Sequence, residues 1–208
     1  MMPATSRLIP ALLLLAAISA PAAAPARADI KSDGRTLVQA MADKVIAILA
    51  DKGMDRAAKE ARFRQILVQN FDVQTIGAYV MGPPWRQASA AQRADYLRLF
   101  ESYIVKVYTG QLSNYSGEKI TVVGVEEDGG GVAVTSRITD VKNDRTIEVK
   151  WRLRQAGAQL RVRDVVLENI SMSLTQQREF ASVFQQRGGT VEGLLAALRE
   201  KIAELDKK

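Results

Sequence analysis

Carboxylate and hydroxyl side chains gather in one stretch of the sequence, RVRDVVLENISMSLTQQREF, which spans residues 161–180. Asp164, Ser171 and Ser173 are the residue types from which a nucleophile and its base could be built. The chain, however, contains no histidine and no cysteine, so the commonest general base is missing and the usual zinc ligand sets cannot form. We therefore predict no catalytic residue, no metal site and no cofactor. The hydroxyls are interpreted as structural, with Ser173 capping a helix and Asn169 and Ser171 serving the turn before it.

Two pairs of nearby carboxylates, Glu126–Glu127 and Asp164–Glu168, are the other candidates for acid–base chemistry. Both pairs lie beside predicted turns or strand ends, where solvated carboxylates are routine, and a catalytic role would need a strongly shifted pKa. The sequence also has no G-x-S-x-G, Walker A or G-x-G-x-x-G motif. A binding protein is therefore favoured over an enzyme, and an exported hydrolase that uses such a carboxylate stays open as a less favoured function.

The strands that must position these residues are predicted in the second half of the chain. The runs KITVVGVEE, GVAVTSRIT, RTIEVKWRLR and AQLRVRDVVL are short and rich in β-branched residues, and turn sequences separate them. They predict a four-stranded antiparallel meander. In the third run, Ile147, Val149, Trp151 and Leu153 share one face, so one face of the sheet is wet and the other lies against helices. The end of the fourth run, VVL, is apolar on both faces, which predicts a buried or bulged strand end.

The wet face of this sheet is expected to carry basic side chains. They are Arg145, Lys150, Arg152, Arg154, Arg161 and Arg163. Such a stripe could bind phosphates, but it has no interleaved aromatic residues on which bases could stack. We predict no nucleic-acid partner, and the sequence leaves open whether this face is merely solvated or docks an acidic protein.

Amphipathic helices are predicted around the sheet from apolar residues at three- and four-residue steps. Their predicted starts are at or near Gly34, Asp55, Asp72, Ser89, Ser173 and Thr190. Ser89 and Gln92 have the spacing of a capping box, and the Gly-Pro-Pro at 82–84 must end the third helix. About six helices on one face of a twisted antiparallel sheet of four or slightly more strands make an α+β fold. Such a fold either fills its centre with side chains or leaves an apolar cavity.

Residues 1–28 have the form of a secretory signal peptide. Arg7 precedes an apolar stretch, and the segment ends in the small-residue sequence ARA at 26–28. The apolar stretch is shorter than the about 20 residues that span a bilayer. We expect cleavage of this segment, export to the periplasm, and one domain over 29–208.

Two longer segments resemble one protein family. FDVQTIGAYVMGPPWRQASAAQRADYLRLFESYIVKVYTGQLSNY, residues 71–115, is similar to the N-terminal signature of the MlaC, or toluene-tolerance, family. DVVLENISMSLTQQREFASVFQQRGGTVEGLLAAL, residues 164–198, is similar to the C-terminal signature of that family. The sequence MGPPW departs from the family's LGxxW pattern by a methionine and a double proline, which leaves the shape of that loop open.

The resemblance implies a periplasmic lipid carrier that performs no reaction on its lipid. It implies helices packed on a twisted antiparallel sheet around a cavity for phospholipid acyl chains, which would otherwise cost about 0.8 kcal/mol per CH₂ exposed to water. It also implies two partners, an inner-membrane ABC transporter complex and an outer-membrane lipoprotein and porin assembly. One branch of the family is associated with hopanoid-producing bacteria, so a hopanoid or another isoprenoid lipid is the alternative cargo.

The candidate lipid-binding residues are apolar positions on the inner face of the sheet and matching positions on the covering helices. They are Val80, Tyr103, Val107, Val122, Val134, Ile138, Val149, Trp151, Leu153, Val162, Val166 and Met172. Ordinary core packing is the competing interpretation for each of them. Tyr103 and Tyr108 are expected at the cavity mouth, because a phenol tolerates one wet end. Val166 and Met172 are expected to face inward, beside the hydroxyls of residues 169–175.

Overall fold

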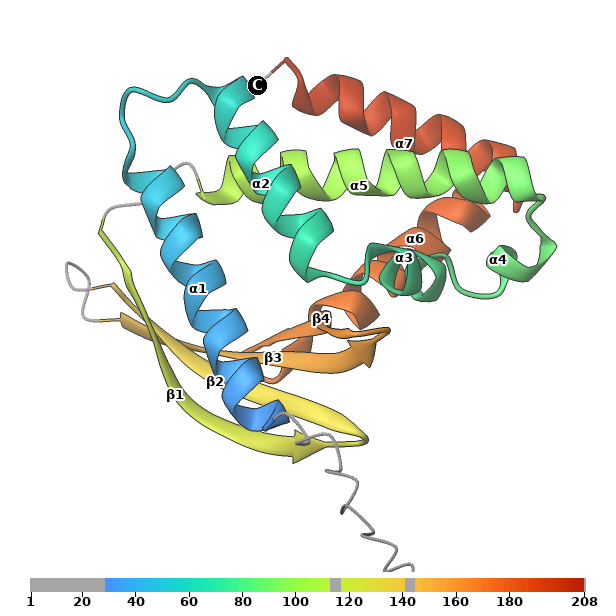
Figure 1. Ribbon diagram of the computed structural model, residues 1–208. Coiled ribbons are helices and arrows are strands. Elements are labelled where there is room, and N and C mark those ends of the chain that lie inside the picture. The colour runs from blue at the N-terminus through green and yellow to red at the C-terminus, as the bar shows by residue number, and fades with distance from the viewer. Residues whose placement is uncertain (1–28, 113–116, 141–144, 208) are drawn as a thin grey trace, which may run out of the picture.

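Five helices, five strands and two further helices follow one another in the part of the chain that the computed structural model describes, residues 29–112, 117–140 and 145–207 (Figure 1). The helices before the strands are α1 (Ile30–Ala50), α2 (Arg56–Asn70), α3 (Val73–Met81), α4 (Pro84–Gln87) and α5 (Ala90–Leu112). The strands are β1 (Lys119–Asp128), β2 (Gly131–Asp140), β3 (Arg145–Ala156), β4 (Gln159–Leu167) and β5 (Ile170–Ser171). The chain continues with α6 (Met172–Gln186) and α7 (Val191–Leu205).

This succession confirms the predicted α+β class and adds two short elements, α4 and β5, to the prediction. The predicted secretory signal at 1–28 and the predicted turn at 141–144 lie outside the described residues. None of the described helices combines the length and the apolar character that crossing a membrane requires.

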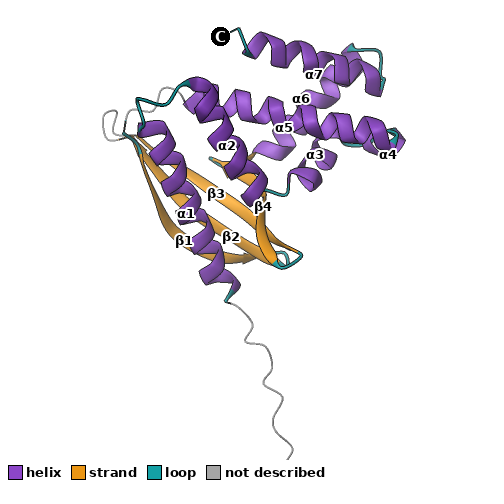
Figure 2. Ribbon diagram, turned by 45° about the horizontal axis from the view of Figure 1, so that its top comes forward, coloured by secondary structure: helices purple, strands orange, loops and turns teal. Residues whose placement is uncertain are grey.

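The strands form one antiparallel sheet in the order β1-β2-β3-β4-β5. The register pairs Val134 with Trp151 and Val149 with Leu167, so apolar side chains of neighbouring strands share one face. Helices cover this inner face and leave the other face of the sheet bare (Figure 2). The alternation predicted for the third strand is therefore confirmed.

A β-bulge in β4 changes which of its side chains face inward. Arg152 pairs with Asp164, whereas the next residue of β3, Leu153, pairs with Val162. Arg163 is therefore an extra residue, and the alternation of faces is shifted by one position beyond it. The bulge agrees with the buried or bulged end predicted from the VVL sequence.

The buried apolar side chains form two separate clusters. The sheet cluster joins α1 and α2 to the inner face of the sheet and consists of Val38, Met41, Ile48, Ile66, Val122, Val132, Val134, Leu153, Leu160 and Val162. The helical cluster lies among α3 and α5–α7 and consists of Val80, Met81, Ala88, Tyr96, Leu99, Phe100, Phe180, Val191, Leu194, Leu195 and Leu198. Figure 1 shows α5 and α7 side by side and away from the sheet, whereas α1 lies along it.

The first turns of α1 lie directly on β2. A Cβ atom on Gly34 would be 2.9 Å from Cγ2 of Val132 and 3.3 Å from Cγ2 of Val134. Glycine allows this close approach because it has no side chain. One turn later, Val38 is fully buried, so the beginning of α1 closes this part of the sheet.

Polar side chains begin several helices where the sequence predicts them. Asp55 accepts a hydrogen bond from the backbone N–H of Ala58 at 2.7 Å. The capping box of α5 is complete, because the N–H of Gln92 donates to Oγ of Ser89 at 3.2 Å and the N–H of Ser89 donates to Oε1 of Gln92 at 2.7 Å. These bonds satisfy amide groups that have no partner within the helix.

Candidate functional site: an apolar pocket between sheet and helices

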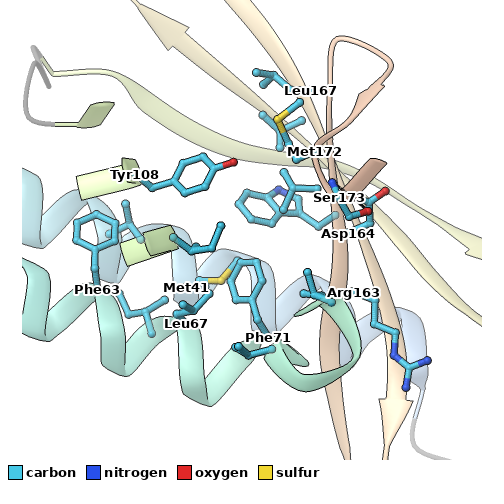
Figure 3. Close-up of a pocket in the computed structure, with 18 of the residues that line it drawn as sticks. Met41, Phe63, Leu67, Phe71, Tyr108, Arg163, Asp164, Leu167, Met172 and Ser173 are labelled. Atoms are coloured by element: carbon cyan, nitrogen blue, oxygen red, sulfur yellow. Dashed lines mark hydrogen bonds between the residues drawn. The ribbon is translucent and has the colours of Figure 1, made fainter. Parts of the chain in front are cut away.

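An apolar pocket of about 320 Å³ lies between the inner face of the sheet and helices α1, α2, α3, α5 and α6 (Figure 3). Its apolar wall consists of Met41, Ala42, Val45, Phe63, Ile66, Leu67, Phe71, Val73, Ile76, Val80, Phe100, Ile104, Val105, Tyr108, Ile120, Ile138, Val149, Trp151, Val165, Leu167 and Met172. Four polar residues, Arg163, Asp164, Ser173 and Gln176, complete the lining. The volume is in the range of small-molecule sites, about 300–1,000 Å³.

The pocket separates the two hydrophobic clusters. Met41 and Ile66 of the sheet cluster lie in its wall, as do Val80 and Phe100 of the helical cluster. Protein interiors are normally close-packed, so a space between two clusters leaves apolar surface on both sides of it. Covering that surface with hydrocarbon is favourable, and the wall offers few hydrogen-bonding groups to a polar molecule.

Several of the predicted residues meet in this wall. Val80, Ile138, Val149, Trp151 and Met172 all line the pocket. They come from α3, β2, β3 and α6, so the fold brings together side chains that are far apart in the sequence. Figure 3 shows the side chain of Met172 at the pocket.

Other predicted residues lie inside the sheet cluster. Val122, Val134, Leu153 and Val162 are at most 9% exposed, and the described pocket wall does not include them. They occupy the predicted inner face, but the structure closes this part of the sheet. Val134, for example, lies beneath Gly34 of α1. In the structure these four residues are therefore packed in the core, which was the alternative to lining a cavity.

The tyrosines of α5 differ in placement. Tyr108 lines the pocket and its ring points into it (Figure 3), whereas Tyr103 packs edge-on against Phe180 with ring centroids 5.8 Å apart. Val107 is half-buried outside the described wall. Burial raises the pKa of the phenol groups of Tyr103 and Tyr108, and the nearby carboxylate of Glu179 raises both further. Tyr108 therefore offers the pocket a neutral hydroxyl.

Val166 does not face inward, so that prediction is wrong. It pairs with Lys150, which belongs to the outer face of the sheet. The bulge at Arg163 is the cause, because it shifts the alternation of side chains by one residue. Val165 and Leu167 therefore face inward, and Val166 between them faces outward.

Asp164 holds the start of α6 at the polar end of the pocket. Its Oδ1 accepts hydrogen bonds from the N–H and the hydroxyl of Ser173 at 3.1 and 2.8 Å, and its Oδ2 accepts from the hydroxyl of Ser171 at 2.7 Å. Oγ of Ser171 in turn accepts from the N–H of Leu174 at 3.1 Å. Ser171 is therefore the N-cap of α6, and the prediction that Ser173 fills this role is wrong.

This polar cluster joins a strand to a helix. Asp164 accepts hydrogen bonds from the hydroxyls of Ser171 and Ser173 and from the backbone N–H of Ser173, so its contacts are those of a helix cap. Within the described ranges, no group of acidic side chains could hold a metal ion. The hydroxyls that stand out in the sequence thus have structural partners.

Arg163 directs its guanidinium group away from the pocket (Figure 3). It pairs with the carboxylate of Asp72 at 3.1 Å, beside a parallel bridge between Phe71 and Val162. Burial alone would raise the pKa of Asp72, but hydrogen bonds from Thr75 and the charge of Arg163 outweigh it, so this pKa is lowered. The arginine therefore fastens the start of α3 to β4, and its charge does not enter the pocket.

The sheet face predicted to be basic carries acidic partners as well. Lys150 pairs with Glu126 at 2.8 Å, and Arg152 and Arg154 pair with Asp128 at 2.8 and 3.1 Å. Hydrogen bonds from Arg152 and then Arg154 lower the pKa of Asp128 to about 2. On this part of the face, therefore, three of the predicted basic side chains are paired with acidic ones.

Sequence reasoning missed most of the helical wall. Val45, Phe63, Leu67, Ile76 and Ile104 all line the pocket. Their spacing marks the inward side of each helix, which is the signal that could have found them. That spacing does not distinguish a side chain packed in a core from one that borders an open space.

Comparisons with known proteins identify relatives of this chain. The family model described as MlaC protein matches residues 39–200. The intermembrane phospholipid transport system binding protein MlaC of Haemophilus influenzae is 20% identical over 177 residues, which cover 81% of this chain and 81% of that protein. Toluene tolerance protein ttg2D of Pseudomonas putida is 22% identical over 119 residues, which cover 57% of this chain and 55% of that protein.

A solved structure has the same architecture. It is that of a phospholipid-binding protein from Ralstonia solanacearum in complex with a phospholipid, and it matches with a TM-score of 0.72 and 25% identity over 84% of this chain and 99% of that chain. The match of the family model over residues 39–200 confirms the resemblance found in the sequence. The chain therefore belongs to the MlaC family.

Proposed function

We propose that this protein is a periplasmic carrier that binds a phospholipid with its acyl chains in the apolar pocket. The observation that carries the proposal is a pocket wall built almost entirely from aliphatic, aromatic and thioether side chains between two hydrophobic clusters. Each CH₂ group that enters such a wall from water contributes about 0.8 kcal/mol. The phospholipid named for the Haemophilus influenzae and Ralstonia solanacearum proteins supports this class of cargo.

The proposal includes the route of the cargo. Residues 1–28 serve as a cleaved export signal, and residues 29–208 form the single lipid-binding domain. The protein shuttles phospholipid between an inner-membrane ABC transporter complex and an outer-membrane lipoprotein and porin assembly. No chemical step on the lipid is proposed, since the serine hydroxyls and the carboxylate beside the pocket hold the first turn of α6.

Analysis of the cargo tests the proposal. The mature protein is purified without detergent, extracted with organic solvent, and the extract is examined by mass spectrometry. We expect phospholipid in stoichiometric amount, and we expect delipidated protein to take up phospholipid from vesicles. A hopanoid or another isoprenoid lipid in its place would establish the alternative cargo. Absence of lipid together with failure to take it up would overturn the proposal.

A further inference from the structure

The indole of Trp151 is a pocket-wall group with a polar atom of its own, and Ser136 engages that atom. Nε1–H of Trp151 donates a hydrogen bond to Oγ of Ser136 at 2.9 Å. Ser136 is 0% exposed, and its hydroxyl donates to the backbone carbonyl of Val149 at 3.4 Å. Trp151 and Val149 both line the pocket, whereas Ser136 is not among its lining residues.

The register of the sheet explains how these residues meet. Ser136 of β2 pairs with Val149 of β3, and Trp151 pairs with Val134. Ser136 and Trp151 are therefore diagonal neighbours on the same face, about 7–8 Å apart at the backbone, within reach of an aromatic side chain. The hydrogen bond requires the indole to lean from β3 toward Ser136 on β2, which restricts the rotamer of Trp151.

An unpaired indole N–H would change the character of the pocket. A donor without an acceptor in apolar surroundings is unfavourable, and it would bind water or a polar atom of the guest instead. The hydroxyl oxygen of Ser136, on the neighbouring strand β2, is the acceptor for this N–H. The carbon atoms of the indole then face the pocket, while the indole N–H is bonded to Ser136.

We propose that Ser136 is a positioning residue for lipid binding. It fixes the orientation of the Trp151 indole and occupies its N–H, so that this part of the wall presents a dry, apolar surface to an acyl chain. The inference rests on the proposed phospholipid-carrier function. It further assigns a selectivity to this part of the wall, since an unmodified stretch of acyl chain matches it and a chain hydroxyl placed against it is left unpaired.

Quenching of tryptophan fluorescence tests the inference. The chain has two tryptophans, and Trp85 lies outside the described wall of this pocket, so the variant Trp85→Phe reports on Trp151 alone. In this background we expect phosphatidylglycerol with brominated acyl chains to quench the fluorescence saturably. Adding Ser136→Ala is expected to weaken the apparent affinity about tenfold. Ser136→Thr, which keeps the hydroxyl, is expected to restore most of it.

Three further variants separate positioning from a general effect on the fold. Thr109→Val removes another buried hydroxyl, which lies outside the described pocket wall, and it is expected to leave lipid affinity unchanged. In a Trp151→Phe background, with bound lipid measured as phosphorus after gel filtration, Ser136→Ala is expected to have almost no effect. Ser136→Cys keeps the volume but accepts hydrogen bonds weakly, and it replaces the alanine variant in every comparison if that variant does not fold.

The outcomes distinguish the inference from the function on which it rests. Saturable quenching with equal affinity in the presence and absence of Ser136→Ala would overturn the positioning role alone. A full effect of Ser136→Ala in the Trp151→Phe background would overturn it too, because the serine would then act without the indole. No quenching in the Trp85→Phe protein would overturn the proposed use of the pocket and the inference with it.

Discussion

Oδ1 of Asp164 accepts two hydrogen bonds from Ser173, one from the backbone N–H and one from the hydroxyl. These bonds connect β4 to the first turn of α6 beside the pocket. Met172, which lines the pocket, lies between Ser173 and Ser171, and both of these serines are bonded to the same carboxylate. The polar cluster therefore positions an apolar wall residue.

Removing the carboxylate of Asp164 should lower the stability of the fold more than removing one of the hydroxyls that donate to it. We expect Asp164→Ala to lower the free energy of unfolding by about 2 kcal/mol, because hydrogen bonds to a charged group contribute about 1.5–3 kcal/mol and the cap loses its acceptor. Ser173→Ala removes one hydroxyl and should cost about 1 kcal/mol. Urea denaturation of the three proteins measures both values. Equal costs would contradict the central role of Asp164.

Two glycines in helices should respond in opposite ways to alanine. Gly34→Ala is expected to destabilise the protein by at least about 1 kcal/mol, since the new Cβ would lie 2.9 Å from Cγ2 of Val132 and overpacking costs about 1–3 kcal/mol. Gly110 is the matched control, because a Cβ there meets nothing within 4 Å. Gly110→Ala should raise the free energy of unfolding by about 0.5 kcal/mol, because it lowers the entropy of the unfolded chain. Denaturation midpoints that move in the same direction would contradict the close contact of α1 with β2.

The ion pairs of Asp128 predict a dependence of stability on pH. The pKa of Asp128 is lowered from 3.8 to about 2, so the folded state favours the charged form. Its stabilising contribution is complete above the unfolded pKa and is lost as the pH falls through the folded pKa. We expect this contribution to be only about 1 kcal/mol, because solvent screens pairs of partly exposed groups such as Arg152.

Asp128→Asn provides the comparison. The difference in unfolding free energy between the two proteins should be constant from neutral pH down to about pH 5 and should shrink between about pH 4 and pH 2. Urea titrations at a series of pH values measure it. A difference that persists unchanged at pH 2 would have a cause other than the charge.

The hydroxyl of Tyr96 is buried without a hydrogen-bond partner among the described residues. Its ring is 0% exposed and stacks on Phe100 with centroids 5.8 Å apart, and burial raises the pKa of the phenol far above its usual range. We expect Tyr96→Phe to leave the stability unchanged or raise it by up to about 1 kcal/mol, because no hydrogen bond is lost and an unpaired polar group is removed. A loss of stability in urea would reveal a partner for this hydroxyl.

Filling the pocket should exclude its cargo. Val45 of α1 is half-buried and lines the pocket, so Val45→Phe adds a ring where acyl chains are proposed to lie. The lipid that co-purifies with this variant, measured by mass spectrometry, is expected to fall at least severalfold, while the secondary structure is retained. Val123→Phe is the matched control, since Val123 is 43% exposed and outside the described wall. Equal loss of lipid in both variants would contradict the assigned site.

The helices and strands were predictable because their signals are local. The Ser89–Gln92 capping box and the two faces of β3 follow from spacing alone, and the structure has both. The cap of α6 was not predictable in this way. Ser171 and Ser173 both precede suitable helical sequence, and Asp164, whose bonds settle their roles, lies on the neighbouring strand β4.

The pocket was predictable in its chemistry but only partly in its residues. Alternation places Val134 and Val149 on one face, yet α1 covers the first through the contact at Gly34 while the second borders the pocket. The distance from a helix to a sheet depends on packing between remote segments, which a single sequence does not encode locally. The bulge at Arg163 had the same effect on Val166, because one extra residue reverses every face beyond it.

The space between the sheet cluster and the helical cluster makes any guest a part of the hydrophobic core. A guest that binds the folded chain and not the unfolded one stabilises the fold, by about 2.7 kcal/mol at a free concentration of one hundred times its dissociation constant. Calorimetric melting of this protein is therefore also a measurement of its load. Unfolding of the protein releases the guest in the same endothermic transition. The melting temperature of a preparation therefore reports which fraction of the molecules carries a guest and which fraction does not.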